Sequence, residues 1–244
     1  GVFEYLQEKK EKGEIKKLGF SFHDTADVLD KILTEQPQME FVQLQINYLD
    51  WEDIKVQSRR CYEVARKHGK DIIVMEPVKG GKLANVTEDA RDYLAKNKPG
   101  MSPACFALGF CASLEGVILV LSGMSDRNQL RENMDYFNNF VPFEDKDFEI
   151  AEKMARLMRN KNLVDCTACQ YCVEGCPKKI DIPKYFAVYN EAVKGRITSK
   201  RKYRTLSKNS TPVTECIECG KCEKSCPQKI NIIEMLKKVK GKFD

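Results

Sequence analysis

The sequence predicts an α/β chain in two parts: four βα units of the TIM-type (β/α)8 barrel class, then a small, mostly α-helical unit rich in cysteine. Two observations support this prediction. Short apolar segments alternate with amphipathic ones from the N-terminus onward, which indicates a parallel sheet with right-handed crossovers. The C-terminal part contains one cysteine pattern twice. We place the βα units at 1–142, a connecting helix at 143–161 and the cysteine-rich unit at 162–244.

Four apolar segments are predicted strands, because they are short and bounded by polar or glycine-containing turns. Apolar strands with helices outside them suit a barrel. Four βα units, however, form only half a barrel, with two open strand edges. We expect the other half to be supplied upstream, to lie on another chain, or to be absent. The predicted strands cover residues 15–20, 41–46, 71–75 and 116–121.

Helices are predicted where apolar residues recur at helical spacing. Gly13 and Gly69 stand where the first and third should stop. Ser102 and the proline after it open another helix in cap-then-proline order. Ser125 is the expected N-cap of a further one. The predicted helices cover residues 2–12, 25–36, 52–68, 125–137 and 144–160.

The cysteine pattern is Cys-x2-Cys-x2-Cys-x3-Cys-Pro in both copies. This is the bacterial iron–sulfur spacing, in which three thiolates bind one cluster and the fourth binds the neighbouring one. We therefore predict two 4Fe-4S clusters with crossed ligand sets. The first set is Cys166, Cys169, Cys172 and Cys226, and the second is Cys216, Cys219, Cys222 and Cys176.

Zinc and disulfides are the alternatives for these cysteines. Zinc would require only two separated Cys-x2-Cys pairs, so a third cysteine and a Cys-Pro would be surplus. Disulfides suit small secreted domains, and no signal peptide pattern is visible here. Iron–sulfur ligation is favoured over both. The three other cysteines, Cys61, Cys105 and Cys111, are expected to be small buried apolar residues.

Composition narrows the partners and the location. The chain has 244 residues, a net charge of +5 and no apolar run long enough to span a membrane. We expect a cytoplasmic protein in a reducing setting such as an anaerobe, with no membrane and no nucleic acid as partner. A basic cluster is either a solvated loop or a docking surface for an acidic redox partner. It comprises Lys194, Arg196, Lys200, Arg201, Lys202, Arg204 and Lys208.

Each cysteine copy continues into a predicted helix, with Asp181 as an N-cap in the first and Asn231 before the second. The long connection between the copies does not suit a compact hairpin. Residues 162–244 resemble the α-helical ferredoxin modules of larger redox enzymes.

Polar motifs follow the four predicted strands in register. They read Gly19-Phe20-Ser21-Phe22-His23, then Gln45-Ile46-Asn47-Tyr48, then Glu76-Pro77-Val78-Lys79-Gly80-Gly81, then Ser125-x3-Gln129-x2-Glu132-Asn133. Their order and spacing resemble the C-terminal half of the aldo/keto reductase family, over about residues 1–140. With the cysteine repeat, the chain resembles an iron–sulfur-containing aldo/keto reductase.

The resemblance implies an NAD(P)H site. Ser21 and Gln45 match the residues that bind the nicotinamide carboxamide, and Met75 stands where the family often stacks a tyrosine. The adenosine end would be bound by Ser125, Gln129, Glu132 and Asn133. Gly123 and Gln129 replace the basic residues that grip the NADP 2′-phosphate, so the choice between NADH and NADPH stays open. Alternatively, Ser125 is a plain helix cap and Gln45 a barrel-lining residue.

The family's catalytic Asp, Tyr, Lys and His belong to the first half of the barrel, and none can be placed here. No catalytic residue is therefore assigned, and this chain alone is not expected to reduce a carbonyl. The leading hypothesis is an NAD(P)-dependent aldo/keto reductase barrel coupled to a two-cluster electron-transfer module, acting on a small carbonyl substrate or with a redox partner protein. The alternative is a non-catalytic iron–sulfur electron carrier or redox sensor on a degenerate barrel.

Overall fold

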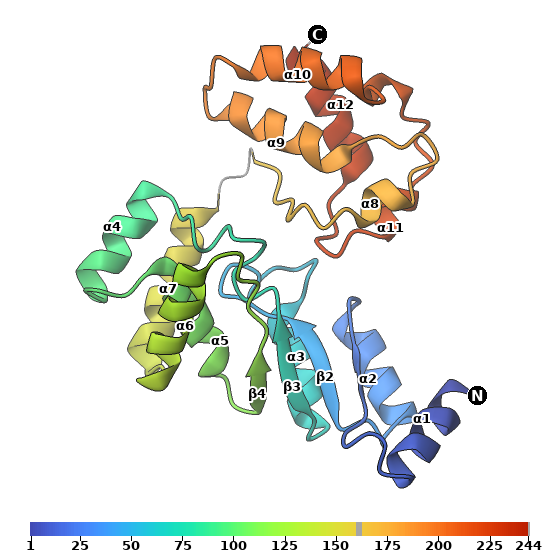
Figure 1. Cartoon of the computed structure of the whole chain (residues 1–244), viewed down its shortest axis with the longest axis vertical. Helices are drawn as coiled ribbons and strands as arrows, with labels where there is room; N and C mark the ends of the chain where they lie inside the picture. Colours follow the sequence, from blue (N-terminus) through green and yellow to red (C-terminus); the bar gives the residue numbers. More distant parts are fainter. Residues whose placement is uncertain (160–162, 244) are drawn as a thin grey trace. The chain divides into compact units, whose positions relative to one another are not determined.

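The computed structural model describes residues 1–159 and 163–243. The chain divides into two compact units, Gly1–Arg159 and Asn160–Asp244 (Figure 1). In the part of the chain that is described, no helix is long and apolar enough to cross a membrane.

The first unit is built on one parallel sheet with strand order β1-β2-β3-β4. Each strand pairs with the next along the chain, as in a barrel segment, so the prediction of a partial (β/α)8 barrel is confirmed. The strands are β1 (Gly19–Ser21), β2 (Phe41–Gln45), β3 (Asp71–Met75) and β4 (Val117–Val120).

Strand β1 is shorter than its apolar pattern predicts. The Leu18 N–H donates to the Glu40 carboxylate at 2.9 Å, so a side chain takes the place of a ladder partner just before Gly19. Gly19 is required at the start of the strand, because a Cβ there would lie 2.4 Å from the Phe41 carbonyl oxygen.

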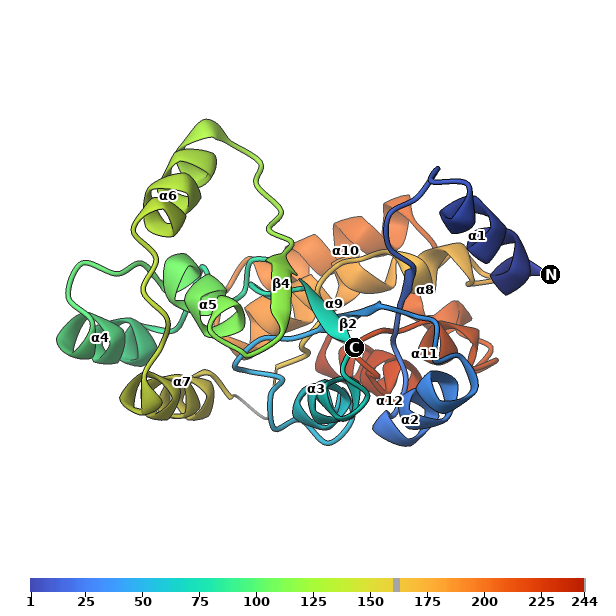
Figure 2. The same ribbon diagram turned by 90° about the horizontal axis from the view of Figure 1, so that it is seen from below.

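Seven helices of this unit are described: α1 (Val2–Glu11), α2 (Ala26–Glu35), α3 (Ser58–Lys67), α4 (Glu88–Asn97), α5 (Pro103–Ala112), α6 (Arg127–Asn138) and α7 (Asp145–Met158). Helices α2 and α3 contact each other and lie on one side of the sheet (Figure 2). Helix α7, which the sequence suggested as a connection, packs against α4 and α5 within the first unit.

The helices differ from the prediction in three places. Helix α3 begins at Ser58 rather than residue 52, because the Asp53 carboxylate holds the preceding segment in a turn by accepting from the N–H groups of Lys55 and Val56. Helix α4 was not predicted, since it buries only Ala90 and Leu94. The N-cap of α6 is Asp126 rather than Ser125.

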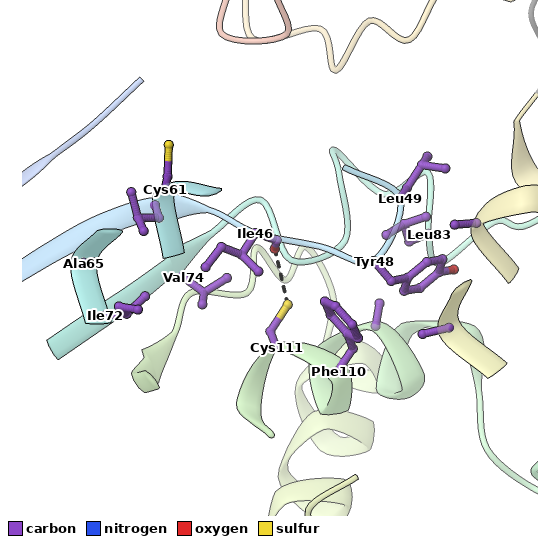
Figure 3. Packing of buried hydrophobic residues seen from close by; sticks show 14 of the residues in the cluster. Ile46, Tyr48, Leu49, Cys61, Ala65, Ile72, Val74, Leu83, Phe110 and Cys111 are labelled. Atoms are coloured by element: carbon purple, nitrogen blue, oxygen red, sulfur yellow. Dashed lines mark hydrogen bonds between the residues drawn. The ribbon is translucent and has the colours of Figure 1, made fainter. Parts of the chain in front are cut away.

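The core of the first unit joins the sheet to α2, α3, α5 and α7. Cys61, Cys105 and Cys111 are buried, as predicted. The Cys111 thiol donates to the Ile46 carbonyl oxygen at 3.3 Å, and the ring of Phe110 packs against that of Tyr48 (Figure 3).

The second unit is helical. It contains α8 (Tyr171–Glu174), α9 (Ile182–Val193), α10 (Ser199–Asn209), the 3-10 helix η1 (Val213–Glu215), α11 (Lys221–Lys224) and α12 (Ile232–Phe243). Helix α9 packs against α10 and α12, and α8 against α11. The rings of Tyr203 and Phe243 stack at 4.4 Å. The segment between the cysteine copies is therefore a pair of packed helices rather than a long loop.

Candidate functional site

The two cysteine loops of the second unit adopt the same backbone conformation. Both place residues with positive φ at equivalent positions, although several of these residues carry side chains that disfavour that conformation. Each copy then forms one short helix that begins directly after such a residue. The matching pairs are Ala168 with Glu218, Gln170 with Gly220, and Lys179 with Lys229.

The Cys-Pro ends of the two loops share their hydrogen bonds as well. The Lys179 N–H donates to the Cys176 carbonyl oxygen at 3.0 Å, and the Lys229 N–H donates to that of Cys226 at the same distance. The repeat in sequence is thus also a repeat in backbone structure. The second cysteine of each copy is exposed and the third is buried.

Cys176 meets the cysteines of the other copy. It lines one cavity together with Cys216, Cys219 and Cys222. Apolar side chains form most of the remaining wall, among them Ile182. Cys176 ends the first loop and the other three cysteines belong to the second, so this cavity is lined by cysteines of both copies.

The other four cysteines influence one another electrostatically. Burial, with smaller contributions from the neighbouring Cys166, Cys169 and Cys226, raises the pKa of the Cys172 thiol to about 12. Burial also raises the pKa of Cys166, with Cys226 and Cys169 contributing to the shift. Cys226 therefore lies among the cysteines of the first copy, and binding iron here would release protons.

The donor set suits clusters. Four thiols surround each location, and thiolates are the ligands that 4Fe-4S clusters use. Among the residues described, no three His, Cys, Asp or Glu side chains converge closely enough to hold a single metal ion. A cubane binds each thiolate to a different iron, so its ligands need not converge on one point.

The second candidate site is the carboxyl edge of the sheet in the first unit. Ser21, Gln45 and Met75 end β1, β2 and β3. Gln45 and Met75 are paired across the two strands, and Ser21 pairs with Gln43. Ser21 is exposed, Met75 is half-buried and Gln45 is buried.

The Gln45 side chain belongs to a buried polar network centred on Asp50. Gln45 Nε2 donates to Asp50 Oδ2 at 2.8 Å, and Asn47 Nδ2 donates to the same oxygen at 2.9 Å. Lys79 Nζ lies 2.5 Å from Asp50 Oδ1. These residues are nearly inaccessible: Asn47 is 0% exposed, Asp50 and Lys79 are 3% exposed, and Gln45 is 6% exposed.

Sequence reasoning missed Asp50 and Lys79. Lys79 lies in a quoted motif, but nothing in its neighbours indicates burial. Asp50 follows β2 by several residues, in a loop folded back by the Asn47 side chain, which accepts from the N–H groups of Leu49 and Asp50. The burial of this ion pair arises from two loops that are distant in the sequence.

An open cleft lies at the ends of β3 and β4, between the loop after β3, the start of α5 and the start of α6. Its wall includes five of the residues predicted for the cofactor: Gly123, Ser125, Gln129, Glu132 and Asn133. Ser21, Gln45 and Met75 are not among its lining residues. The structure thus brings the residues predicted for the adenosine end together in one cleft.

The N-terminus of α6 is occupied by a carboxylate. Asp126 Oδ1 accepts from the N–H groups of Asn128 and Gln129 at 2.8 and 3.0 Å. Ser125 instead pairs with Gln129, whose Oε1 accepts from the Ser125 N–H at 2.8 Å. The N–H groups of Asn128 and Gln129, which a phosphate at this helix end would need, are therefore already partnered.

Glu76 lines the same cleft and has an unusual environment. Its φ is +58°, which strains a residue with a Cβ. Its Oε2 atom is shielded from solvent and has no hydrogen-bond partner among the described residues. Burial raises the pKa of this carboxyl above its usual value, while Lys79 and the Gly80 N–H partly oppose the shift.

Two protein-family models match separate parts of the chain. The model of the aldo/keto reductase family matches residues 1–156, and that of the 4Fe-4S dicluster domain matches residues 165–231. No curated protein matched the chain.

Solved structures share the fold of the first unit. An aldo-keto reductase from Bacillus halodurans in its holo form is 20% identical, with a TM-score of 0.50, covering 62% of this chain and 54% of that one. Its apo form has the same identity and TM-score, covering 62% and 55%. A Klebsiella pneumoniae aldo-keto reductase in complex with NADPH is 14% identical, with a TM-score of 0.49, covering 65% and 55%. The chain spans about half the length of these structures.

The parallel four-stranded sheet and the match over most of the chain lead to one conclusion: the chain belongs to the aldo/keto reductase family, and residues 165–231 match the model of a 4Fe-4S dicluster domain.

Proposed function

We propose that the chain is part of an oxidoreductase whose second unit transfers electrons through two 4Fe-4S clusters. The first cluster would be held by Cys166, Cys169, Cys172 and Cys226, and the second by Cys176, Cys216, Cys219 and Cys222. The observation that carries this proposal is the cavity that Cys176 shares with the cysteines of the second copy. When bound, each cluster supplies a site that exchanges one electron.

The chain's own residues hold and shield the clusters. Cys172 and Cys222 are buried, so their thiolates would bind iron away from water. Ile180, Ile182 and Leu236 line the cavity of the second set and limit solvent access. Cys169 and Cys219 are exposed and mark where a redox partner can approach each cluster most closely.

Metal and sulfide analysis of anaerobically purified protein tests the proposal. We expect about eight irons and eight acid-labile sulfides, as two cubanes require. Stoichiometric zinc without sulfide contradicts it. Cys176→Ser should reduce the iron content by up to half and change the EPR signal of the second set, whereas Cys61→Ser, a buried cysteine of the first unit, should leave both unchanged.

We further propose that the carboxyl edge of the first unit binds a nicotinamide dinucleotide, NADH or NADPH. Ser21, Gln45 and Met75 would contact the nicotinamide. Gly123, Ser125, Gln129, Glu132 and Asn133 would contact the adenosine end, and the support for this is that these five residues line one cleft. No catalytic residue is assigned within this chain. Calorimetric titration with NADH and NADPH is the direct test.

The second candidate function is an electron carrier or redox sensor in which the barrel is a scaffold. The commitment of the Gln45 amide to Asp50 and the carboxylate cap of α6 favour it. Binding of neither dinucleotide at millimolar concentration, with both clusters intact, would decide for this candidate.

The partner of the second unit is proposed to be an acidic redox protein rather than a membrane or a nucleic acid, in a reducing cellular setting. The segment from Lys194 to Lys208 carries an exposed basic surface, and Ile197 within it is 97% exposed. Electrostatic steering by such a surface weakens as salt screens it. Its members are Lys194, Arg196, Lys200, Arg201, Arg204 and Lys208. For the barrel, the proposed substrate remains a small carbonyl compound.

A further inference from the structure

The cleft at the ends of β3 and β4 is poor in positive charge. It is lined by two carboxylates, Glu76 from the loop after β3 and Glu132 from α6, and no lysine or arginine is among its lining residues. The side chain of Asp126 occupies the N–H groups at the start of α6. Sites for a diphosphate normally combine free helix N–H groups with cationic side chains. This cleft presents the opposite charge.

Glu76 is the carboxylate that matters most, because the fold fixes it in place. The Asn47 amide donates to the Glu76 carbonyl oxygen at 3.1 Å, and the Lys79 N–H donates to it at 3.0 Å. The left-handed backbone at Glu76 is therefore held from two sides. These bonds fix the backbone from which the Glu76 side chain reaches the wall of the cleft.

We propose, on the basis of the dinucleotide site described above, that Glu76 is a specificity-determining residue of the cleft. Its ionised carboxylate opposes the phosphates of a ligand, so a dinucleotide binds to the form of the protein in which Glu76 is protonated. A nucleoside, which has no phosphate, binds to both forms.

The charged groups around Glu76 favour this behaviour. Lys79, on the same loop, is the cation that stabilises the ionised form, but its Nζ is bonded to Asp50. Asp50, from the loop after β2, stabilises the protonated form. Glu132, on α6, lines the same cleft and adds a second negative charge. The buried, unpartnered Oε2 is consistent with a carboxyl group that exchanges a proton when a ligand binds.

The experiment compares NADH with adenosine on the cluster-loaded full chain and on Glu76→Gln, by calorimetry between pH 5.5 and 8.5. Two unit charges about 6 Å apart, at an effective dielectric constant of about 20–40, alter affinity roughly 10- to 100-fold. Glu76→Gln should strengthen NADH binding by about that factor at pH 8.5 and leave adenosine binding unchanged. Wild-type affinity for NADH should fall as the pH rises, whereas that of the variant should vary little.

Glu88→Gln is the matched control, because Glu88 is an exposed glutamate at the start of α4 and is not among the residues lining the cleft. It should behave as wild type. If adenosine and NADH both bind but Glu76→Gln alters neither the affinity for NADH nor its pH dependence, the inference is overturned and the proposed site stands. If neither ligand binds either protein, the proposed dinucleotide site fails and the inference fails with it.

Discussion

Replacing Lys79 by methionine tests whether the buried network at the carboxyl edge stabilises the first unit. Lys79 Nζ and Asp50 Oδ1 are 2.5 Å apart, and their side chains are only 3% and 5% exposed. Lys79→Met leaves the Asp50 carboxylate buried with amide donors alone. Breaking a buried pair from one side costs about 3–5 kcal/mol. With a urea m-value of about 2–3 kcal/mol/M, the unfolding midpoint should fall by about 1–2.5 M.

The assay is urea unfolding followed by the fluorescence of Trp51, the only tryptophan in the chain. Trp51 directly follows Asp50 and packs against Tyr62 and Phe110 at 5.4 and 5.5 Å, so it reports on the first unit. The double variant Lys79→Met with Asp50→Asn should lose much less than the sum of the single variants, because no uncompensated charge remains. Lys17→Met, which removes an exposed ion pair with Asp71, is the control. A Lys79→Met midpoint within the range of that control would refute the reasoning.

Three further outcomes are expected. The chain should self-associate in sedimentation experiments, because the edge strand β4 exposes Ile118 and Leu119 at 51% and 49%; a clean monomer contradicts this. Glu76→Gln should stabilise the first unit at neutral pH, because the pKa of Glu76 is raised in the folded state and the wild type loses stability as this carboxyl ionises. The gain should vanish as the pH falls below about 4.5. A gain independent of pH would argue otherwise. NADH alone should leave the visible absorbance of the oxidised clusters unchanged, while dithionite should bleach it. A nicotinamide gives two electrons as hydride, each cluster takes one, and no flavin motif is visible in the sequence. Bleaching by NADH would show direct electron transfer from the nicotinamide to the clusters.

Local patterns were enough to predict most of the fold. Strands β2 and β3 coincide with predicted apolar segments to within one residue at each end. Helix α5 begins where Ser102 and Pro103 predicted, and the Ser102 hydroxyl accepts from the Cys105 N–H at 3.2 Å. The error at β1 occurred where a side chain distant in the sequence, that of Glu40, takes the place of a backbone partner.

The cap of α6 shows a different limit. Ser125 and Asp126 are adjacent, and both residue types cap helices well. The choice between them depends on the path of the chain leaving β4, which the sequence pattern does not specify. In the structure, Asp126 accepts from the helix and Ser125 pairs with Gln129, so a one-residue difference puts a carboxylate, rather than a hydroxyl, at the N-terminus of α6.

The two candidate sites differ in how much of their geometry is local. Each cysteine loop carries three prospective ligands within a few residues, so spacing alone predicts the chemistry, and only Cys176 and Cys226 depend on how the loops pack. The carboxyl edge, by contrast, is assembled from loops after different strands. Gln45 was placed correctly at the end of β2, yet the Asp50 carboxylate that accepts from it also binds Lys79, which comes from the loop after β3. Motifs in register therefore locate such a site, while its charge and hydrogen bonding depend on residues that no single motif contains.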